Sequence, residues 1–173
     1  MAKNIAILAE DDYEDLELWY PLLRLREEGF EVTVVGMDCD VYYSKHGYEV
    51  VADAAVDEVD PNTFDGVIVP GGWAPDRLRR YPVVNDFVRK LFDSGKLVAS
   101  ICHGASVLIS AGILKGKKVT AVSAIKDDLI NAGARFIDTE VICDGNLITS
   151  RGPADLPAFV REIVKTLKDQ GSR

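Results

Sequence analysis

Cys102, His103 and Gly104 are the residues of this chain whose types and spacing could do chemistry. The mostly apolar residues 98–101 lead into the cysteine, and residues 106–112 read as a short helix that ends at a glycine. A buried strand that turns sharply into a helix, with a nucleophile at the turn, is a nucleophile elbow, which presents the side chain to a substrate. The free N–H groups and the dipole of such a helix favour the thiolate, which is the reactive form of cysteine.

The cysteine could instead be a packing residue, because free cysteine is among the most buried residue types. The chain has only two histidines, His103 and His46, so a histidine base must be one of them. His103 directly follows the cysteine, whereas His46 lies in a turn where a solvated role is expected, and this favours His103. Asp76 is a candidate to orient the histidine, with a helix cap as its alternative role.

Two further loops are expected to meet the cysteine, because sites in parallel sheets gather beyond the carboxyl ends of the strands. Glu14 follows the first apolar run, and its carboxyl group would help a thiolate only when protonated, as a hydrogen-bond donor. Its alternative role is an acid in the first turn of a helix. Gly72 follows a third apolar run, and its N–H could approach an oxyanion closely, together with the N–H of His103. A plain turn is the alternative at Gly72.

The hydrophobic pattern predicts the elements that would bring these residues together. Short apolar runs predict buried strands over residues 4–9, 31–36, 65–72 and 96–101. Helical spacing predicts helices over residues 15–29, 82–94, 106–112, 125–132 and 153–168, with a kink or a late start at Pro21. Residues 38–54 predict a small antiparallel excursion that turns at Gly47, residues 114–120 a short strand, residues 140–150 a hairpin and residues 169–173 a frayed tail. The alternation predicts an α/β sandwich with a largely parallel sheet and one domain over residues 1–173.

Composition excludes several classes of protein. The chain has 173 residues, of which 47% are hydrophobic, and its net charge of −8 disfavours nucleic acid and anionic membranes as partners. The sequence shows neither a signal peptide nor an apolar run of the roughly 20 residues that a membrane span needs. Cys39, Cys102 and Cys143 are scattered and odd in number, which argues against a disulfide framework or a zinc site. We therefore expect a cytoplasmic protein without a metal or a cofactor.

The chain resembles the PfpI-type intracellular cysteine peptidases of the ThiJ/PfpI superfamily, which also contains protein deglycases. Class I glutamine amidotransferases are distant relatives of this superfamily. The matching segments run through nearly the whole chain, at residues 13–17, 45–48, 69–72, 74–75, 99–104, 125–128, 130–133, 144–146, 150–151 and 153–156. The resemblance implies a flavodoxin-like three-layer sandwich with a nucleophile elbow.

The resemblance also implies roles for individual residues. Cys102 would be the nucleophile, Glu14 the acid that touches its sulfur, and His103 the base. Gly72 and His103 would supply the N–H groups of the oxyanion hole. In PfpI-type peptidases a glutamate from a neighbouring subunit completes the triad, and here that position holds Asp76, which is one methylene shorter.

Dimers are general in this superfamily, and PfpI-type members form hexamers built as trimers of dimers, so the resemblance implies a homo-oligomer. Val122 departs from similar proteins, which often carry a tyrosine near the site entrance. The expected function is a cysteine-dependent hydrolase, a peptidase or amidase that attacks a carbonyl through Cys102. The alternatives are a glyoxalase or deglycase acting on methylglyoxal or glycated groups, and a stress-response protein that senses oxidation through Cys102.

Overall fold

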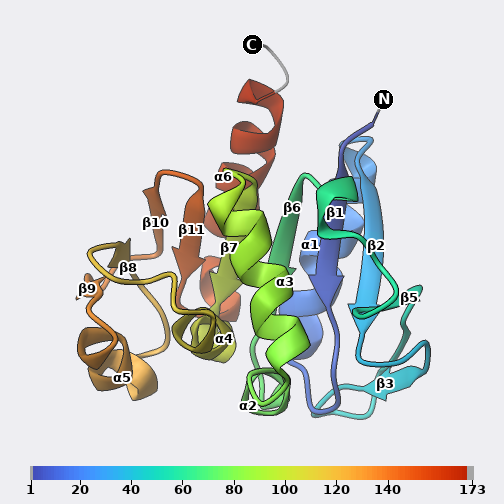
Figure 1. Ribbon diagram of the computed structural model, residues 1–173, viewed down its shortest axis with the longest axis horizontal. Coiled ribbons are helices and arrows are strands. Elements are labelled where there is room, and N and C mark those ends of the chain that lie inside the picture. The colour runs from blue at the N-terminus through green and yellow to red at the C-terminus, as the bar shows by residue number, and fades with distance from the viewer. Residues whose placement is uncertain (1, 171–173) are drawn as a thin grey trace.

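A seven-stranded sheet forms the centre of the protein in a computed structural model that describes residues 2–170 (Figure 1). The strands in spatial order are β10 (Val141–Asp144), β11 (Leu147–Ser150), β7 (Leu97–Ile101), β6 (Gly66–Val69), β1 (Asn4–Leu8), β2 (Glu31–Gly36) and β5 (Ala54–Ala55). All neighbouring strands are parallel except β10 and β11, which form the predicted hairpin. The prediction of a mostly parallel sheet is therefore confirmed.

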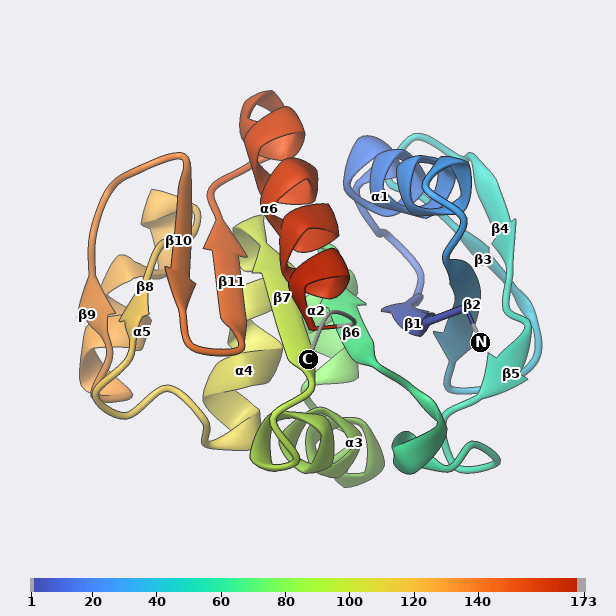
Figure 2. The ribbon, with the colours of Figure 1, turned by 90° about the horizontal axis from the view of Figure 1, so that it is seen from above.

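Helices cover both faces of this sheet, which gives the predicted three layers. Figure 2 shows α1 (Asp15–Glu27) and α6 (Leu156–Asp169) on one face, with α3 (Pro82–Asp93) and α4 (Ala105–Ala111) on the other. Successive residues of a strand point to opposite faces. In β1, Ile5 and Ile7 accordingly pack in the core beneath α1 and α6, whereas Ala6 and Leu8 pack in the core beneath α3 and α4.

Smaller elements surround the two main layers of helices. The predicted antiparallel excursion is the hairpin of β3 (Val41–Tyr43) and β4 (Glu49–Val51). A short helix, α2 (Ala74–Leu78), follows β6, and α5 (Lys126–Asn131) lies between β8 (Lys118–Val119) and β9 (Arg135–Phe136). β8 and β9 pair with each other outside the main sheet. β5 and β9 were not predicted, because a strand of two residues leaves no periodic pattern.

Several boundaries differ from the sequence prediction: the strand predicted over residues 114–120 is only Lys118–Val119, and α6 begins at Leu156 after a 3-10 turn over residues 153–155. α1 begins at Asp15 and continues through Pro21, so the helix does not start late. α6 extends to Asp169, where the pattern predicted the start of a frayed tail, and residues 171–173 lie outside the described residues. Within residues 2–170, no helix is long and apolar enough to cross a membrane.

Candidate active site

The loops that the sequence singled out follow three strands that are neighbours in the sheet. β7, β6 and β1 lie side by side, and their carboxyl ends lead into Cys102, Gly71 and the acidic residues 10–12, respectively. These ends point to the edge where α2 lies, toward the bottom of Figure 1. The predicted convergence of the three loops is therefore present in the fold.

Cys102 occupies a tight turn between β7 and α4. Its φ of 58° lies in the left-handed region, which only glycine adopts without strain. Residues 102–104 form a 3-10 turn, and α4 begins at Ala105. A Cβ at Gly104 would overlap the carbonyl oxygen of Val69 on the neighbouring strand, so glycine is required for this close approach. The structure thus has the backbone of a nucleophile elbow, and the cysteine is half-buried.

The carboxyl group beside the thiol belongs to Glu17, and the assignment of Glu14 to this place is wrong. Glu14 is the N-cap of α1, and its side chain accepts a hydrogen bond from the backbone N–H of Glu17 at 2.8 Å. Glu17 lies in the first turn on the buried side of the helix, and it interacts with the Cys102 side chain. Helix geometry explains the difference, because an N-cap side chain folds back over the first turn instead of pointing into the core.

A signal for Glu17 was present in the sequence. Glu17, Pro21 and Leu25 follow one another at intervals of four residues, and all three are buried together with Leu18 and Leu22. An acid inside the apolar stripe of a helix must be buried when the helix packs. Buried carboxyl groups are rare unless they are paired, so this position was the stronger candidate for a functional acid.

The two oxygens of Glu17 have different surroundings. Oε2 accepts the backbone N–H of Gly71 at 2.7 Å. Oε1 is buried and has no hydrogen-bond partner among residues 2–170. Burial raises the pKa of Glu17 from its ordinary value of 4.5 to about 7, and the charge of Glu14 adds to this effect. A neutral carboxylic acid, with its proton on Oε1, therefore suits this position near neutral pH.

The thiol of Cys102 lies in the same poorly solvated place. Burial raises its pKa to about 12, and the negative charge of Glu17 contributes in the same direction. The backbone N–H groups of His103 and Gly72 face the thiol and act in the opposite direction. A proton on Glu17 removes the repulsion between the two groups and provides a donor for the thiolate. The protonation state of Glu17 therefore affects how readily the Cys102 thiol ionises.

The N–H of Gly72 is held in place by the geometry of its peptide bond. The carbonyl oxygen of Gly71 accepts the backbone N–H of Glu14 at 3.1 Å. In a trans peptide the carbonyl and the following N–H point in opposite directions. The N–H of Gly72 is therefore directed away from Glu14, and it faces Cys102 together with the N–H of His103. Two backbone donors converge on one place, as an oxyanion hole requires.

His103 lies beside the thiol, but Asp76 does not orient it within the chain. Nδ1 of His103 is 3.4 Å from Sγ of Cys102, and its ring packs against Trp73 with the centroids 5.3 Å apart. Burial lowers the pKa of His103, and Lys45 adds to the effect, so the ring is neutral near pH 7 and can accept a proton. Asp76 instead pairs with Arg80 at i,i+4 on the surface.

The other residues considered from the sequence lie away from the sulfur. Nδ1 of His46 is 2.7 Å from Oδ2 of Asp15, and the side chain of His46 is largely exposed. Cys39 and Cys143 are free and exposed. The structure therefore brings together Cys102, His103 and the N–H of Gly72, and it adds Glu17 to them.

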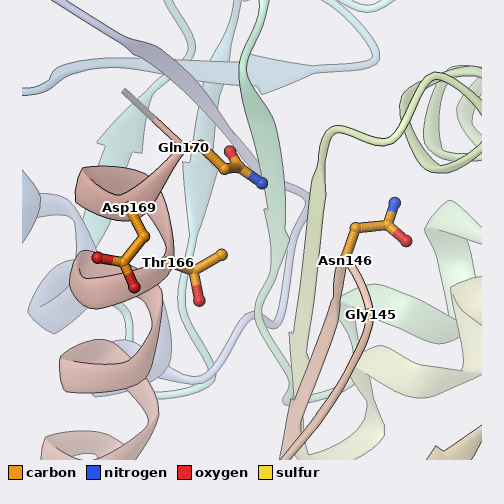
Figure 3. A pocket seen from close by; sticks show the side chains of 5 residues that line it. All are labelled: Gly145, Asn146, Thr166, Asp169 and Gln170. Atoms are coloured by element: carbon orange, nitrogen blue, oxygen red, sulfur yellow. The ribbon is translucent and has the colours of Figure 1, made fainter. Parts of the chain in front are cut away.

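Two cavities differ in their relation to this site. One of about 560 Å³ is lined by residues 121–123 and 151–155 among others, at the carboxyl end of β11, which pairs with β7. Val122 lines this cavity where the resemblance led us to expect a tyrosine. The other, of about 520 Å³, lies between the β10–β11 turn and the end of α6 (Figure 3). It is at the amino end of β11, at the edge of the sheet opposite to Cys102, so it is separate from this site.

Known proteins resemble this chain over almost its full length. Residues 3–166 match the DJ-1/PfpI family. Deglycase PfpI of Pyrococcus furiosus is 50% identical over 165 residues, which cover 95% of this chain and 99% of the relative. YraA of Bacillus subtilis, which carries a provisional cysteine-protease name, is 41% identical over 169 residues, covering 97% of this chain and 100% of the relative. The names of both relatives are those of enzymes.

A solved structure agrees with this similarity. It is a two-domain protein from Anabaena variabilis with a DJ-1/ThiJ/PfpI-like domain and a ferritin-like domain. The match has a TM-score of 0.95 and 43% sequence identity, and it covers 96% of this chain and 48% of that one. The present chain therefore spans about half of the two-domain protein.

Proposed function

The chain belongs to the DJ-1/PfpI family, and from that premise we propose that it is a cysteine-dependent enzyme whose Cys102 thiolate adds to a carbonyl carbon. We propose aldehydes such as methylglyoxal, or the glycated groups that form from them, as its substrates. The observation that carries this proposal is the buried carboxyl group of Glu17 beside the thiol. This carboxyl group can accept and return the proton of the thiol, and it belongs to the same chain as Cys102.

The first step is the addition of sulfur to the aldehyde. Because the pKa of Glu17 is about 7, part of the protein carries the ionised carboxylate near neutral pH. In this form Glu17 accepts the thiol proton, and the thiolate of Cys102 forms a bond to the carbonyl carbon while the C=O π electrons move to oxygen. The N–H groups of Gly72 and His103 stabilise the resulting alkoxide. The alkoxide then takes a proton from the carboxylic acid of Glu17, and a neutral hemithioacetal results.

The later steps turn the hemithioacetal into a 2-hydroxy acid. The neutral ring of His103 removes the proton from the former aldehyde carbon, and the electron pair of that C–H bond moves to the neighbouring ketone oxygen, which gives an enediolate. A proton then passes from the hydroxyl of the former aldehyde carbon to this oxygen. Return of the first proton from His103 to the former ketone carbon, with closure of the C=O bond at the former aldehyde carbon, gives the thioester of a 2-hydroxy acid. Water then hydrolyses the thioester and restores Cys102, so that methylglyoxal and one water become lactate. No group leaves in the first step, so the aldehyde route needs no acid to protonate an amine.

Peptide or amide hydrolysis is the second candidate. The pair of N–H donors at Cys102 favours it, because acyl transfer through a thioester needs an oxyanion hole. Its leaving amine must be protonated by His103, which would need an orienting carboxylate. We propose that in this case Asp76 comes from another subunit of a homo-oligomer, after release from Arg80. The aldehyde route is supported better because its groups are together in a single chain.

We also propose a setting for this enzyme, which the resemblance to PfpI-type proteins and the composition support. We take residues 1–173 as one domain of the family that acts in the cytoplasm as a homo-oligomer, a dimer or a hexamer. Its net charge of −8 speaks against nucleic acid as a partner.

One set of assays distinguishes these activities. Purified protein is incubated with methylglyoxal, with lactate as the measured product, and with a fluorogenic peptide. Lactate formation that is lost in Cys102→Ala is the expected result, and turnover that survives in that variant would overturn every mechanism through Cys102. Peptide cleavage alone would favour the hydrolase. Selective oxidation of Cys102 by peroxide without any turnover would favour the sensor.

Glu17→Gln and Glu14→Gln form a matched pair for the role of the carboxyl group. Both remove one carboxylate from the start of α1, but only Glu17 interacts with the thiol. We expect Glu17→Gln to lose about 100-fold or more in kcat, which is within the range for general acid–base groups. Glu14→Gln keeps an oxygen for the helix cap and is expected to retain most of its activity. Equal losses in both variants would contradict the role given to Glu17.

A further inference from the structure

We propose that the ion pair between Asp12 and Arg77 positions the Gly72 N–H against Cys102, which makes both residues positioning residues for the oxyanion hole. The inference rests on the proposed function of this site as a place where Cys102 attacks a carbonyl. It concerns two residues that contact neither the thiol nor the substrate. Their role would be exerted through the backbone of residues 12–14 and 71–73.

The backbone of Asp12 connects the β3–β4 hairpin to the loop of Gly72. Its φ of 63° is in the left-handed region, which aspartate tolerates better than most residues. Its N–H donates to the carbonyl oxygen of Tyr43 at 2.7 Å, and its carbonyl oxygen accepts the N–H of Trp73 at 2.8 Å. Tyr13, the next residue, forms an antiparallel bridge with Gly72. Residues 12–14 therefore hold the peptide groups on both sides of Gly72.

This contact leaves no free space between the two segments. A Cβ built on Gly72 would overlap the carbonyl oxygen of Asp12, and it would lie 2.5 Å from the backbone nitrogen of Glu14. Segments in such close contact cannot move independently. A shift of Asp12 must therefore move Gly72, and with it the N–H that faces Sγ of Cys102.

The side chain of Asp12 completes a closed ring of contacts around Gly72. Its carboxylate pairs with the guanidinium of Arg77, which lies on α2, the helix that follows Gly72 and Trp73. The loop is thus held from one side by the backbone of Asp12 and from the other by α2 through Arg77. Both side chains are about half exposed, at 43% for Asp12 and 48% for Arg77.

Arg77 also neutralises the acidic loop that carries Asp12. The guanidinium interacts with the charges of Glu10 and Asp11 as well as with Asp12, and these interactions raise its pKa. Glu10 is buried, so a cation near it is favourable. Without Arg77, three neighbouring carboxylates would repel one another at the place where the backbone must stay fixed. Arg77 therefore stabilises the loop through the charges of Glu10 and Asp11 as well as through its contact with Asp12.

The experiment measures the reactivity of Cys102 without any substrate. Asp12→Asn, Arg77→Met and the double variant are alkylated with iodoacetamide over a range of pH, and modification of the Cys102 peptide is followed by mass spectrometry. Peptide-level detection is needed because Cys39 and Cys143 are exposed. Asp86→Asn is the matched control, since it breaks another exposed ion pair, with Arg89, outside the site. Thermal unfolding monitors the fold of each variant.

We expect each single variant to alkylate about two- to fivefold more slowly than the wild type, as a half-exposed ion pair allows. The double variant should be no slower than the singles, because both changes break the same contact. Arg77→Lys keeps the cation and should recover part of the rate, and kcat should fall with KM unchanged. A wild-type rate in folded single variants would overturn the inference. So would multiplied losses in the double variant or an equal loss in Asp86→Asn.

The alkylation rate separates this inference from the proposed function. If the wild type shows no turnover of aldehydes or peptides, the proposed function fails, but the rate still reports whether Asp12 and Arg77 act on Cys102. If turnover is found and the rates do not change, only the positioning role fails.

Discussion

Replacing Glu17 by glutamine should make the protein more stable at high pH while it disables the site. The carboxyl group has no exposed surface, and burial raises its pKa from 4.5 to about 7. Between these two values the unfolded chain has released the proton while the folded protein keeps it. The folded state binds more protons in this window, so its stability falls as the pH rises through it.

The magnitude follows from the two pKa values. A rise from 4.5 to about 7 corresponds to about 3 kcal/mol of lost stability once the pH exceeds the folded value. Glutamine does not titrate, and its amide oxygen can accept the Gly71 N–H that now binds Oε2. The free energy of unfolding of Glu17→Gln relative to the wild type should therefore increase by about 3 kcal/mol from about pH 4.5 to about pH 8.

Urea unfolding followed by far-UV circular dichroism, repeated across this range of pH, measures the difference. The difference between the two proteins matters more than either curve, because other titrating groups affect both equally. Glu14→Gln provides the baseline, since it removes a less buried carboxylate from the same end of the helix. A constant difference between Glu17→Gln and the wild type at every pH would refute the reasoning, because the buried carboxyl group would then not carry a raised pKa.

Four glycine and cysteine substitutions test the backbone of the site. Gly72→Ala places a Cβ against the carbonyl oxygen of Asp12, and we expect a fall in kcat of about 100-fold or more in steady-state assays, because one oxyanion donor moves. Gly104→Ala places a Cβ against the carbonyl oxygen of Val69, and we expect thermal unfolding to show a loss of about 1–3 kcal/mol. Cys102→Gly should be more stable than Cys102→Ala by about 1 kcal/mol, since only glycine adopts a φ of 58° without strain, and both should be inactive. Equal stability of the two Cys102 variants would show that the elbow is not strained.

The strands and helices of the main layers could be predicted because their signals are local. Each buried strand is a short apolar run, and each helix has an apolar stripe, as in α6, where six buried residues recur at helical spacing. β5 and β9 have two residues each, which is too short for a pattern, whereas β8 lies within the short strand predicted over residues 114–120. Their pairing depends on how the chain folds back in space, and that information is not contained in a short window.

The features of the site that depend on adjacent residues could be predicted from the sequence, and those that depend on the direction of a side chain could not. The strand-to-helix turn at Cys102 could be read from adjacent residues, as could the glycine at position 72. The start of α1 at Asp15 was predicted, so the choice between Glu14 and Glu17 depended on recognising that Glu14 caps the helix while Glu17 lies on its buried side. The pair of Asp76 and Arg80 could have been anticipated, because i,i+4 residues of opposite charge meet on a helical turn.

The features that give this site its chemistry are also those that weaken the fold around it. A glycine at position 102 would relieve the left-handed backbone, and a neutral side chain at position 17 would avoid a buried acid. Strain and buried charge persist only where the surrounding structure fixes them, and they concentrate at functional sites. Here both occur within one pair of interacting side chains, Cys102 and Glu17. Burial disfavours the ionised form of each group, so the charge of the pair belongs to only one group at a time. In the proposed mechanism, the position of one proton between them therefore decides whether the site holds an inert thiol or a nucleophile.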